Sequence, residues 1–428
     1  MLVLKRVISL SLVCMLLFNI LIPVCVFGVN MPDFAVVDSN LVDIDNNEET
    51  AYKTAESSIK SVVTSTTPAF AFESKSQILM EATTGEVIYA NNENERLLPA
   101  SVTKIMTLLL IMEKIDSGGL KYTDEVRCSK EASSMGGSQI WFKEGETLTV
   151  DEALKCICVV SANDVSYAMA ELVGGTHENF VQMMNNKAHE LGMVNTNFMN
   201  AHGIDEEGHY TTAKDIALMS KELIVKHPDI TKYTTIWMDT IRNGEFGLSS
   251  TNKLLKSYEG ITGLKTGSTS QALFNLSATA EREGLSLIAV VMKAPSSAIR
   301  NAEITSLLNY GFSTYSSKEL AVKGEVIDSI YINKNIEKKI NLVYEQDECV
   351  VSKKGETYEL EKVVELNKNI TAPLEKGCVV GCVKFVDKEG KVVKQTNVVT
   401  DESVDKSNLW CYITKIIKTY GIRGLKMS

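Results

Sequence analysis

Histidine and cysteine are scarce in this chain, and their placement excludes two kinds of site. Only five of the 428 residues are histidines, and they are scattered, without an HExxH or similar motif. Two of the nine cysteines lie in the apolar first 28 residues, which leaves an odd number spread over a long chain and argues against a disulfide scaffold. No histidine lies near Cys156 and Cys158 or near Cys378 and Cys382. We therefore expect these four to be small buried apolar side chains, and we expect no metal and no cofactor.

An excess of positive charge is also missing. The chain has 44 lysines and arginines against 54 aspartates and glutamates, a formal net charge of −10. A net acidic chain is a poor candidate for general nucleic-acid binding, so we expect no nucleic-acid partner. The hydrophobic content of 44% and the charged content of 23% are ordinary for a globular protein. The length allows two or more domains.

The longest apolar run stands at the N-terminus. Residues 1–28 read MLVLKRVISLSLVCMLLFNILIPVCVFG, with a basic pair at Lys5 and Arg6, an apolar stretch and a small-residue end. This pattern predicts a cleaved signal peptide and therefore an exported protein. An uncleaved transmembrane anchor is the alternative, because the run approaches spanning length. Residues 29–71 are rich in Asn, Ser, Thr, Asp and Glu, which is typical of a flexible linker.

Residues 72–318 form a predicted α+β domain, in which strand and helix patterns follow one another in blocks. The stretch QILMEATTGEVIYANN predicts a hairpin around a Thr-Gly turn. Helices are predicted from Pro99 to the glycines at 118–119, over 149–174 and 176–191, and from Thr212 to His227. Three strand-like runs between 260 and 294 precede a last helix. This order predicts helices packed on an antiparallel sheet.

The two C-terminal segments differ from this domain in character. Residues 319–402 contain short β runs divided by turns, which predicts a small all-β domain. In residues 403–428, five basic residues and no acidic one follow Asp405. Apolar residues there recur at helical spacing: Leu409, Trp410, Ile413, Ile416, Ile417 and Tyr420. This pattern predicts an amphipathic helix that anchors the exported protein to a membrane surface. A terminal helix docked on its own protein is the alternative.

The stretch PASVTKIMT places Ser101 and Lys104 three positions apart, on one face of a predicted helix. A serine hydroxyl is inert until a base removes its proton. A lysine can act as that base only when neutral, so its pKa must fall far below the free value of ~10.4. Apolar neighbours and a second cation both lower it, and Lys265 is the candidate cation. Alone, the pair is a weak signal, because a capping serine and a snorkelling lysine give the same pattern.

Two further motifs strengthen this signal. VVSANDVSYA contains a polar break, Ser161-x-Asn163, inside an apolar segment, and GLKTGSTS contains Lys265, Thr266 and Gly267 on a predicted strand. Ser-x-x-Lys, Ser-x-Asn and Lys-Thr-Gly in this order are the signature of penicillin-binding proteins and serine β-lactamases. The three motifs together therefore predict nucleophilic catalysis by Ser101.

The chain resembles the low-molecular-mass penicillin-binding proteins that act as D-alanyl-D-alanine carboxypeptidases, the S11 peptidase family. The resemblance is closest to the Gram-positive, clostridial and bacillar type, some of which serve sporulation. It runs from about Phe72 to Tyr315 and continues through the β module and tail, with matching stretches such as LPASVTKIMT, SSMGGSQIW, NTNFMNAHGI, STNKLL and GLKTGSTSQA. It implies a transpeptidase/β-lactamase-like domain, a small β domain and a C-terminal amphipathic anchor.

The resemblance also implies roles for the first two motifs. Ser101 would be the acylated serine and Lys104 its base. Ser161 would relay a proton between the lysines and the leaving group. Asn163 would orient Lys104 and bind the substrate amide.

The third motif would bind substrate. Lys265 and Thr266 would hold a terminal carboxylate, and Gly267 would leave room for the substrate backbone. The backbone N–H groups of Ser101 and Thr269 would form the oxyanion hole by family geometry. Arg300 matches a family arginine behind the lysine-bearing strand, and a surface helix charge is the alternative.

Two positions depart from the family pattern. Thr262 stands where the family usually has Asp, and the Gly that usually follows Ala272 is missing. Both flank the expected site, where they would alter specificity or rate without touching the nucleophile or the lysines.

The sequence thus predicts an exported, membrane-associated serine carboxypeptidase. It would remove the terminal D-alanine of peptidoglycan stem pentapeptides through an acyl-enzyme on Ser101, and β-lactams would acylate the same serine. A class A-like β-lactamase is the first alternative, but it needs a Glu–water pair, and the nearest string, ELGMVN from Glu190 to Asn195, is unconvincing. A catalytically quiet peptidoglycan-binding scaffold is the second, and intact Ser101, Lys104 and Lys265 argue against it.

Overall fold

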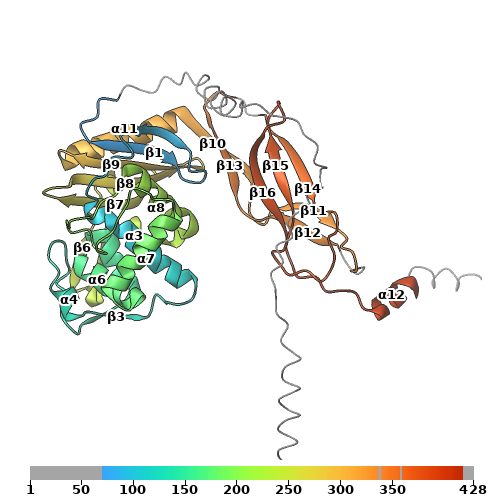
Figure 1. The fold of residues 1–428 in the computed structure, drawn as a ribbon, viewed down its shortest axis with the longest axis horizontal. Helices are drawn as coiled ribbons and strands as arrows, with labels where there is room; N and C mark the ends of the chain where they lie inside the picture. The colour runs from blue at the N-terminus through green and yellow to red at the C-terminus, as the bar shows by residue number, and fades with distance from the viewer. Residues whose placement is uncertain (1–69, 336–338, 357–358, 418–428) are drawn as a thin grey trace, which may run out of the picture. The chain divides into compact units, whose positions relative to one another are not determined.

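The computed structural model describes residues 70–335, 339–356 and 359–417 (Figure 1). The predicted signal peptide, all but the last two residues of the predicted linker and the last eleven residues lie outside the described residues. Within the described ranges, no helix is both long and apolar enough to cross a membrane.

One five-stranded antiparallel sheet organises the first domain, in the order β2-β1-β9-β8-β7 (Figure 1). The strands are β1 (Ser76–Glu81), β2 (Val87–Asn91), β7 (Ile261–Thr269), β8 (Leu273–Arg282) and β9 (Leu285–Ala294). The sequence predicted the β1–β2 hairpin and the β7–β8–β9 set. It did not show that β1 pairs with β9 across more than 200 residues and joins them into one sheet.

Helices cover both faces of this sheet, so β9 is buried along nearly its whole length, as its apolar run requires. Helix α11 (Ser297–Thr314) packs on one face, and α8 (Ala213–Lys226) packs on the other with α3 (Lys104–Asp116) behind it (Figure 1). Residues 104–112 of α3 are all buried, which explains why this helix is apolar on every side. The mixed helix and sheet class is confirmed.

The rest of this domain consists of further helices, both long and short, and of two short strand pairs. The helices are α4 (Lys130–Ser133), α5 (Val150–Lys155), α6 (Asn163–Gly174), α7 (His177–Glu190), α9 (Thr231–Thr234) and α10 (Leu254–Ser257). The strand pairs are β3 (Glu125–Arg127) with β4 (Thr147–Thr149), and β5 (Met238–Ile241) with β6 (Phe246–Ser249).

Two predicted helices are each divided at the point where a motif serine lies. The predicted helix from Pro99 begins with a 3₁₀ turn, η1 (Ala100–Thr103), and becomes α-helical at Lys104. The predicted helix over 149–174 is interrupted by a π-helical turn, η2 (Cys156–Val160), and by Ser161 in the left-handed region at φ +63°. The helix begins at a capping box, in which Thr149 and Glu152 bond reciprocally. Ser161 marks a break in the second helix, because a left-handed serine cannot continue a right-handed helix.

A second, all-β module follows, as expected. Its larger sheet has the order β11-β12-β16-β15-β14, and β10 pairs with β13. The bounds are β10 (Tyr315–Ala321), β11 (Val326–Ile330), β12 (Ile340–Tyr344), β13 (Glu348–Lys353), β14 (Glu361–Leu366), β15 (Val379–Val386) and β16 (Val392–Thr400).

Cys156 and Cys158 are buried as expected, but Cys378 and Cys382 are only half-buried, so the expectation was wrong for this pair. Both lie at or near β15, whose strand is covered only in part.

A short C-terminal helix, α12 (Leu409–Ile416), ends the described chain. Leu409 and Trp410, at its start, are 76% and 69% exposed.

Candidate active site

Ser101 lies in η1, on a backbone turn that is clamped from two sides. Its neighbour Ala100 has φ +50°, a strained value for a residue with a side chain. A Cβ on Gly267 of β7 would come within 2.8 Å of Pro99 O, and one on Gly203 would come within 1.9 Å of Ala100 O. Backbone atoms of β7 and of the 197–210 loop therefore touch the turn directly, and only glycine permits this approach.

Lys104 is fully buried, one turn from the serine, and its amine makes three contacts. Its Nζ lies 2.6 Å from Asn163 Oδ1, 2.5 Å from the carbonyl oxygen of His202 and 3.0 Å from Ser101 Oγ. The first two partners can only accept hydrogen bonds, so they take the two N–H bonds of a neutral amine. The remaining lone pair then faces the Ser101 hydroxyl, which is the arrangement of a base and its nucleophile.

The electrostatics favour that neutral amine. Burial, and then the charge of Lys265, hold the pKa of Lys104 well below its usual range, with Asp164 opposing. Burial lowers the pKa of Lys265 to about 8, Cys158 opposes this shift, and the Arg300 charge adds to it. Lys265 therefore remains charged at neutral pH, as the expected second cation should.

The Ser-x-Asn motif follows the π-helical turn. Ser161 Oγ is buried without a hydrogen-bond partner among the residues that the structure describes, and it faces the same pocket as Ser101. Asn163 begins α6, and its Nδ2 donates to the carbonyl oxygen of Gly136 at 2.7 Å. This bond fixes the orientation of the amide, so that Oδ1 is the atom that faces Lys104.

The buried carboxylate of Asp164 fixes the loop of residues 136–142, which lies against the start of α6. Asp164 Oδ2 accepts from the backbone N–H groups of Ile140 and Phe142, each at 3.0 Å. Ser138, on the same loop, accepts from the N–H of Asn163 at 2.7 Å. The loop is thereby fixed over the start of α6.

The Lys-Thr-Gly motif lies on β7, the edge strand beside η1. Lys265 is 1% exposed, and its Nζ donates to the carbonyl oxygen of Thr266. The Thr266 hydroxyl lies 2.7 Å from that of Thr251. Arg300, on α11, is buried, which lowers its pKa to about 10. The surface-charge alternative for Arg300 is therefore wrong.

One small pocket of about 210 Å³ collects most of the predicted residues. Of these, the residues that line it are Ser101, Ser161, Thr266, Gly267 and Arg300. Lys104, Asn163 and Lys265 lie buried next to it, and Lys104 Nζ contacts both Ser101 Oγ and Asn163 Oδ1. Thr269 is the exception, because it does not line the pocket and its hydroxyl accepts from Ala272 N.

Sequence reasoning missed several groups at this pocket. Ser138, Thr251 and Lys253 line it, and they lie in the stretches SSMGGSQIW and STNKLL, which match the family but had no assigned role. The acceptor on His202 is a backbone carbonyl, which no side-chain motif reveals.

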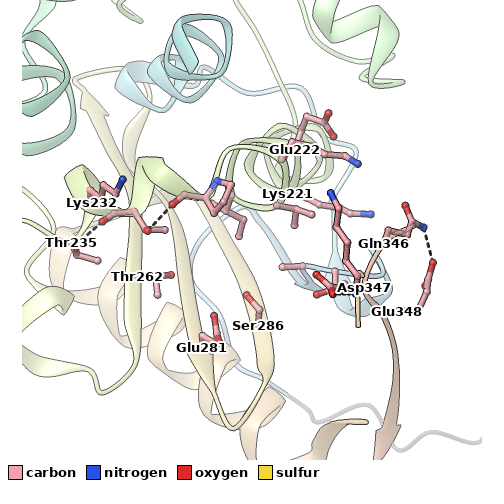
Figure 2. Close-up of a pocket in the computed structure, with 18 residues that line it drawn as sticks. Lys221, Glu222, Lys232, Thr235, Thr262, Glu281, Ser286, Gln346, Asp347 and Glu348 are labelled. Carbon is pink, nitrogen blue, oxygen red and sulfur yellow. Dashed lines mark hydrogen bonds between the residues drawn. The ribbon is translucent and has the colours of Figure 1, made fainter. Parts of the chain in front are cut away.

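The two departures from the family pattern have different settings. The residue after Ala272 is Leu273, at φ +56°, so a leucine occupies a left-handed position that glycine adopts more easily. Thr262 lines a different cavity, together with Lys232, Thr235 and Glu281 (Figure 2). This other cavity is the larger of the two, but it contains none of the predicted site residues, so we assign the chemistry to the pocket at Ser101.

Comparison with known proteins agrees with this geometry. Residues 61–296 match the family model of D-alanyl-D-alanine carboxypeptidases, peptidase S11, and residues 315–406 match the C-terminal domain of penicillin-binding protein 5. The chain is 42% identical over 359 residues to D-alanyl-D-alanine carboxypeptidase DacF of Bacillus subtilis, covering 83% of this chain and 91% of that protein.

Two solved structures extend the similarity. Penicillin binding protein 5 from Haemophilus influenzae is 29% identical with a TM-score of 0.63, covering 79% of this chain and 99% of that one. Penicillin-binding protein D2 from Listeria monocytogenes, in its cefotaxime-bound form, is 30% identical with a TM-score of 0.53, covering 57% of this chain and 99% of that one. The chain therefore belongs to the S11 peptidase family of D-alanyl-D-alanine carboxypeptidases.

Proposed function

We propose that this protein removes the terminal D-alanine of peptidoglycan stem pentapeptides through an acyl-enzyme on Ser101. The observation that carries the proposal is the trio of contacts at Lys104 Nζ, because it leaves one lone pair directed at Ser101 Oγ. The family match supports the substrate class.

The reaction has two steps. Lys104 takes the proton of Ser101 as Oγ bonds to the carbonyl carbon of the penultimate D-alanine, and the C–N bond then breaks. The leaving amine receives a proton from Lys104, relayed by the unpartnered hydroxyl of Ser161. Water then adds to the ester as one of its protons passes to Lys104. The C–Oγ bond breaks, Lys104 returns the proton to Ser101 Oγ, and the shortened peptide is released. The backbone N–H of Ser101, which lines the pocket, would stabilise the oxyanion.

The cations of the pocket suit a free terminal carboxylate. Arg300 and Thr266 line the pocket, and Lys265 is buried beside Thr266. A carboxylate bound at this point would place the scissile peptide bond beside Gly267, where the absence of a side chain leaves room for substrate backbone.

Penicillin labelling tests the proposal directly. We expect the protein to form a lasting adduct with labelled penicillin and to release D-alanine from a peptide ending in D-Ala-D-Ala. Ser101→Ala should abolish both, while Ser133→Ala, at a half-buried serine on α4, should leave them unchanged. Fast penicillin turnover without an adduct would instead indicate a β-lactamase, and absence of both reactions would indicate a scaffold.

We further propose that the protein is exported and binds the outer leaflet of the cytoplasmic membrane through α12 and the residues after it. Leu409, Trp410, Tyr412 and Ile417 expose apolar surface there, and the basic residues of this segment complement anionic lipid.

Sedimentation with phosphatidylglycerol vesicles tests this anchor. With residues 1–28 removed from both, we expect the chain that runs to residue 428 to sediment with the vesicles and the one that ends at residue 402 to stay in solution. Trp410→Ser should weaken binding, because this indole is 69% exposed and would enter the lipid interface. Equal sedimentation of the full and shortened chains would contradict the proposal.

A further inference from the structure

Asn275 is a fully buried amide on β8, directly opposite Gly267 of β7 in the sheet register. It lies at a register shift between β8 and β9, where the pairing skips from Phe274 to Leu276. A bulge of this kind leaves a ladder group unpaired and re-aims a side chain, and bulges are frequent next to active sites.

The side chain uses three hydrogen bonds to join two segments. Nδ2 donates to the carbonyl oxygens of Leu98 at 2.9 Å and Pro99 at 3.0 Å, and Oδ1 accepts from the N–H of Lys293 at 2.7 Å. The orientation of the amide is determined by these partners, since the carbonyls require the donor and the N–H requires the acceptor.

These bonds attach the backbone just before the nucleophile to the sheet. The attached carbonyls directly precede Ala100, whose φ of +50° is strained and must be maintained by its surroundings. The backbone carbonyl of Asn275 also accepts from the Arg300 guanidinium at 3.4 Å. One residue thus contacts the serine turn and Arg300 while facing Gly267 across the strand pair.

We infer that Asn275 is a positioning residue that fixes the Ser101 turn against β7, so that Ser101 Oγ reaches both Lys104 and the substrate carbonyl. The inference rests on the proposed function. A loss of these bonds releases the turn, and misplacing a nucleophile by about 1 Å costs on the order of 100-fold in rate.

The experiment measures the rate of acylation by labelled penicillin in Asn275→Ala and Asn275→Leu. Leucine matches the shape of asparagine without its hydrogen bonds. The matched control is Gln77→Ala, because Gln77 is equally buried in the same sheet, also makes three side-chain hydrogen bonds and lies on β1. The final labelled fraction reports how much protein is folded, and the rate within that fraction reports positioning.

We expect both Asn275 variants to be acylated about 100-fold more slowly, with kcat for D-alanine release reduced and KM little changed. Gln77→Ala should lose thermal stability and keep the wild-type rate. A wild-type rate in either Asn275 variant, even with a smaller labelled fraction, overturns the inference. Failure of the wild-type protein to be labelled would instead overturn the proposed function.

Discussion

Replacing Lys104 with methionine is expected to lower the rate of acylation of Ser101 by about 10⁴-fold, the upper range for loss of a general base. Methionine preserves the length and packing of the side chain but has no basic atom. Asn163 Oδ1 and the His202 carbonyl lose their donor, while Ser101 loses the group 3.0 Å away that accepts its proton. Stopped-flow measurement with a labelled penicillin gives the rate.

Lys114→Met is the control for this substitution, because Lys114 lies on the same helix and is exposed. It should leave the rate unchanged. In the wild-type protein, acylation should also fall as the pH drops through the lowered pKa of Lys104, since the protonated amine cannot accept a proton. A methionine variant that keeps the wild-type rate and pH profile would show that another group removes the proton.

The order and chemistry of the motifs could be predicted from the sequence, because the side chains themselves carry them. Ser101, Lys104 and Asn163 do meet, although 59 positions separate the lysine from the asparagine. The distance between the Lys-Thr-Gly motif and Ser101 could not be predicted from the sequence. It depends on β7 being the edge strand beside η1, which follows from the order of strands in the sheet.

Two supports of the site have no sequence signature at all. The group of His202 that accepts from Lys104 Nζ is its backbone carbonyl, which any residue at this position could supply. Asn275 would be an ordinary strand residue by periodicity, and only the register shift between β8 and β9 turns it toward the carbonyls of Leu98 and Pro99. The alternation of apolar and polar residues along a strand indicates which face of the sheet each side chain takes. A bulge shifts this alternation by one residue and leaves no mark in the residue types themselves.

The 197–210 loop provides the second large prediction. Gly203→Ala is expected to reduce the free energy of unfolding by about 4 kcal/mol, the range of severe single substitutions, and acylation by about 100-fold. Its φ is +86°, and an added Cβ would lie 1.9 Å from Ala100 O and 3.0 Å from Ser101 N. The collision is with backbone, which cannot rotate away, so either the loop or the serine turn must move.

Gly208→Ala separates this collision from backbone strain, because Gly208 belongs to the same loop and has the same φ of +86°. The nearest atom to its added Cβ is Met199 Sδ at 3.6 Å, an ordinary contact. Gly208→Ala should therefore cost only the left-handed strain of about 1–2 kcal/mol and leave acylation intact. Urea unfolding and penicillin labelling measure both variants. Equal losses in the two would mean that strain alone acts, whereas a selective loss of acylation in Gly203→Ala would show that close packing of this loop sets the positions of Ser101 and of the His202 carbonyl that binds Lys104.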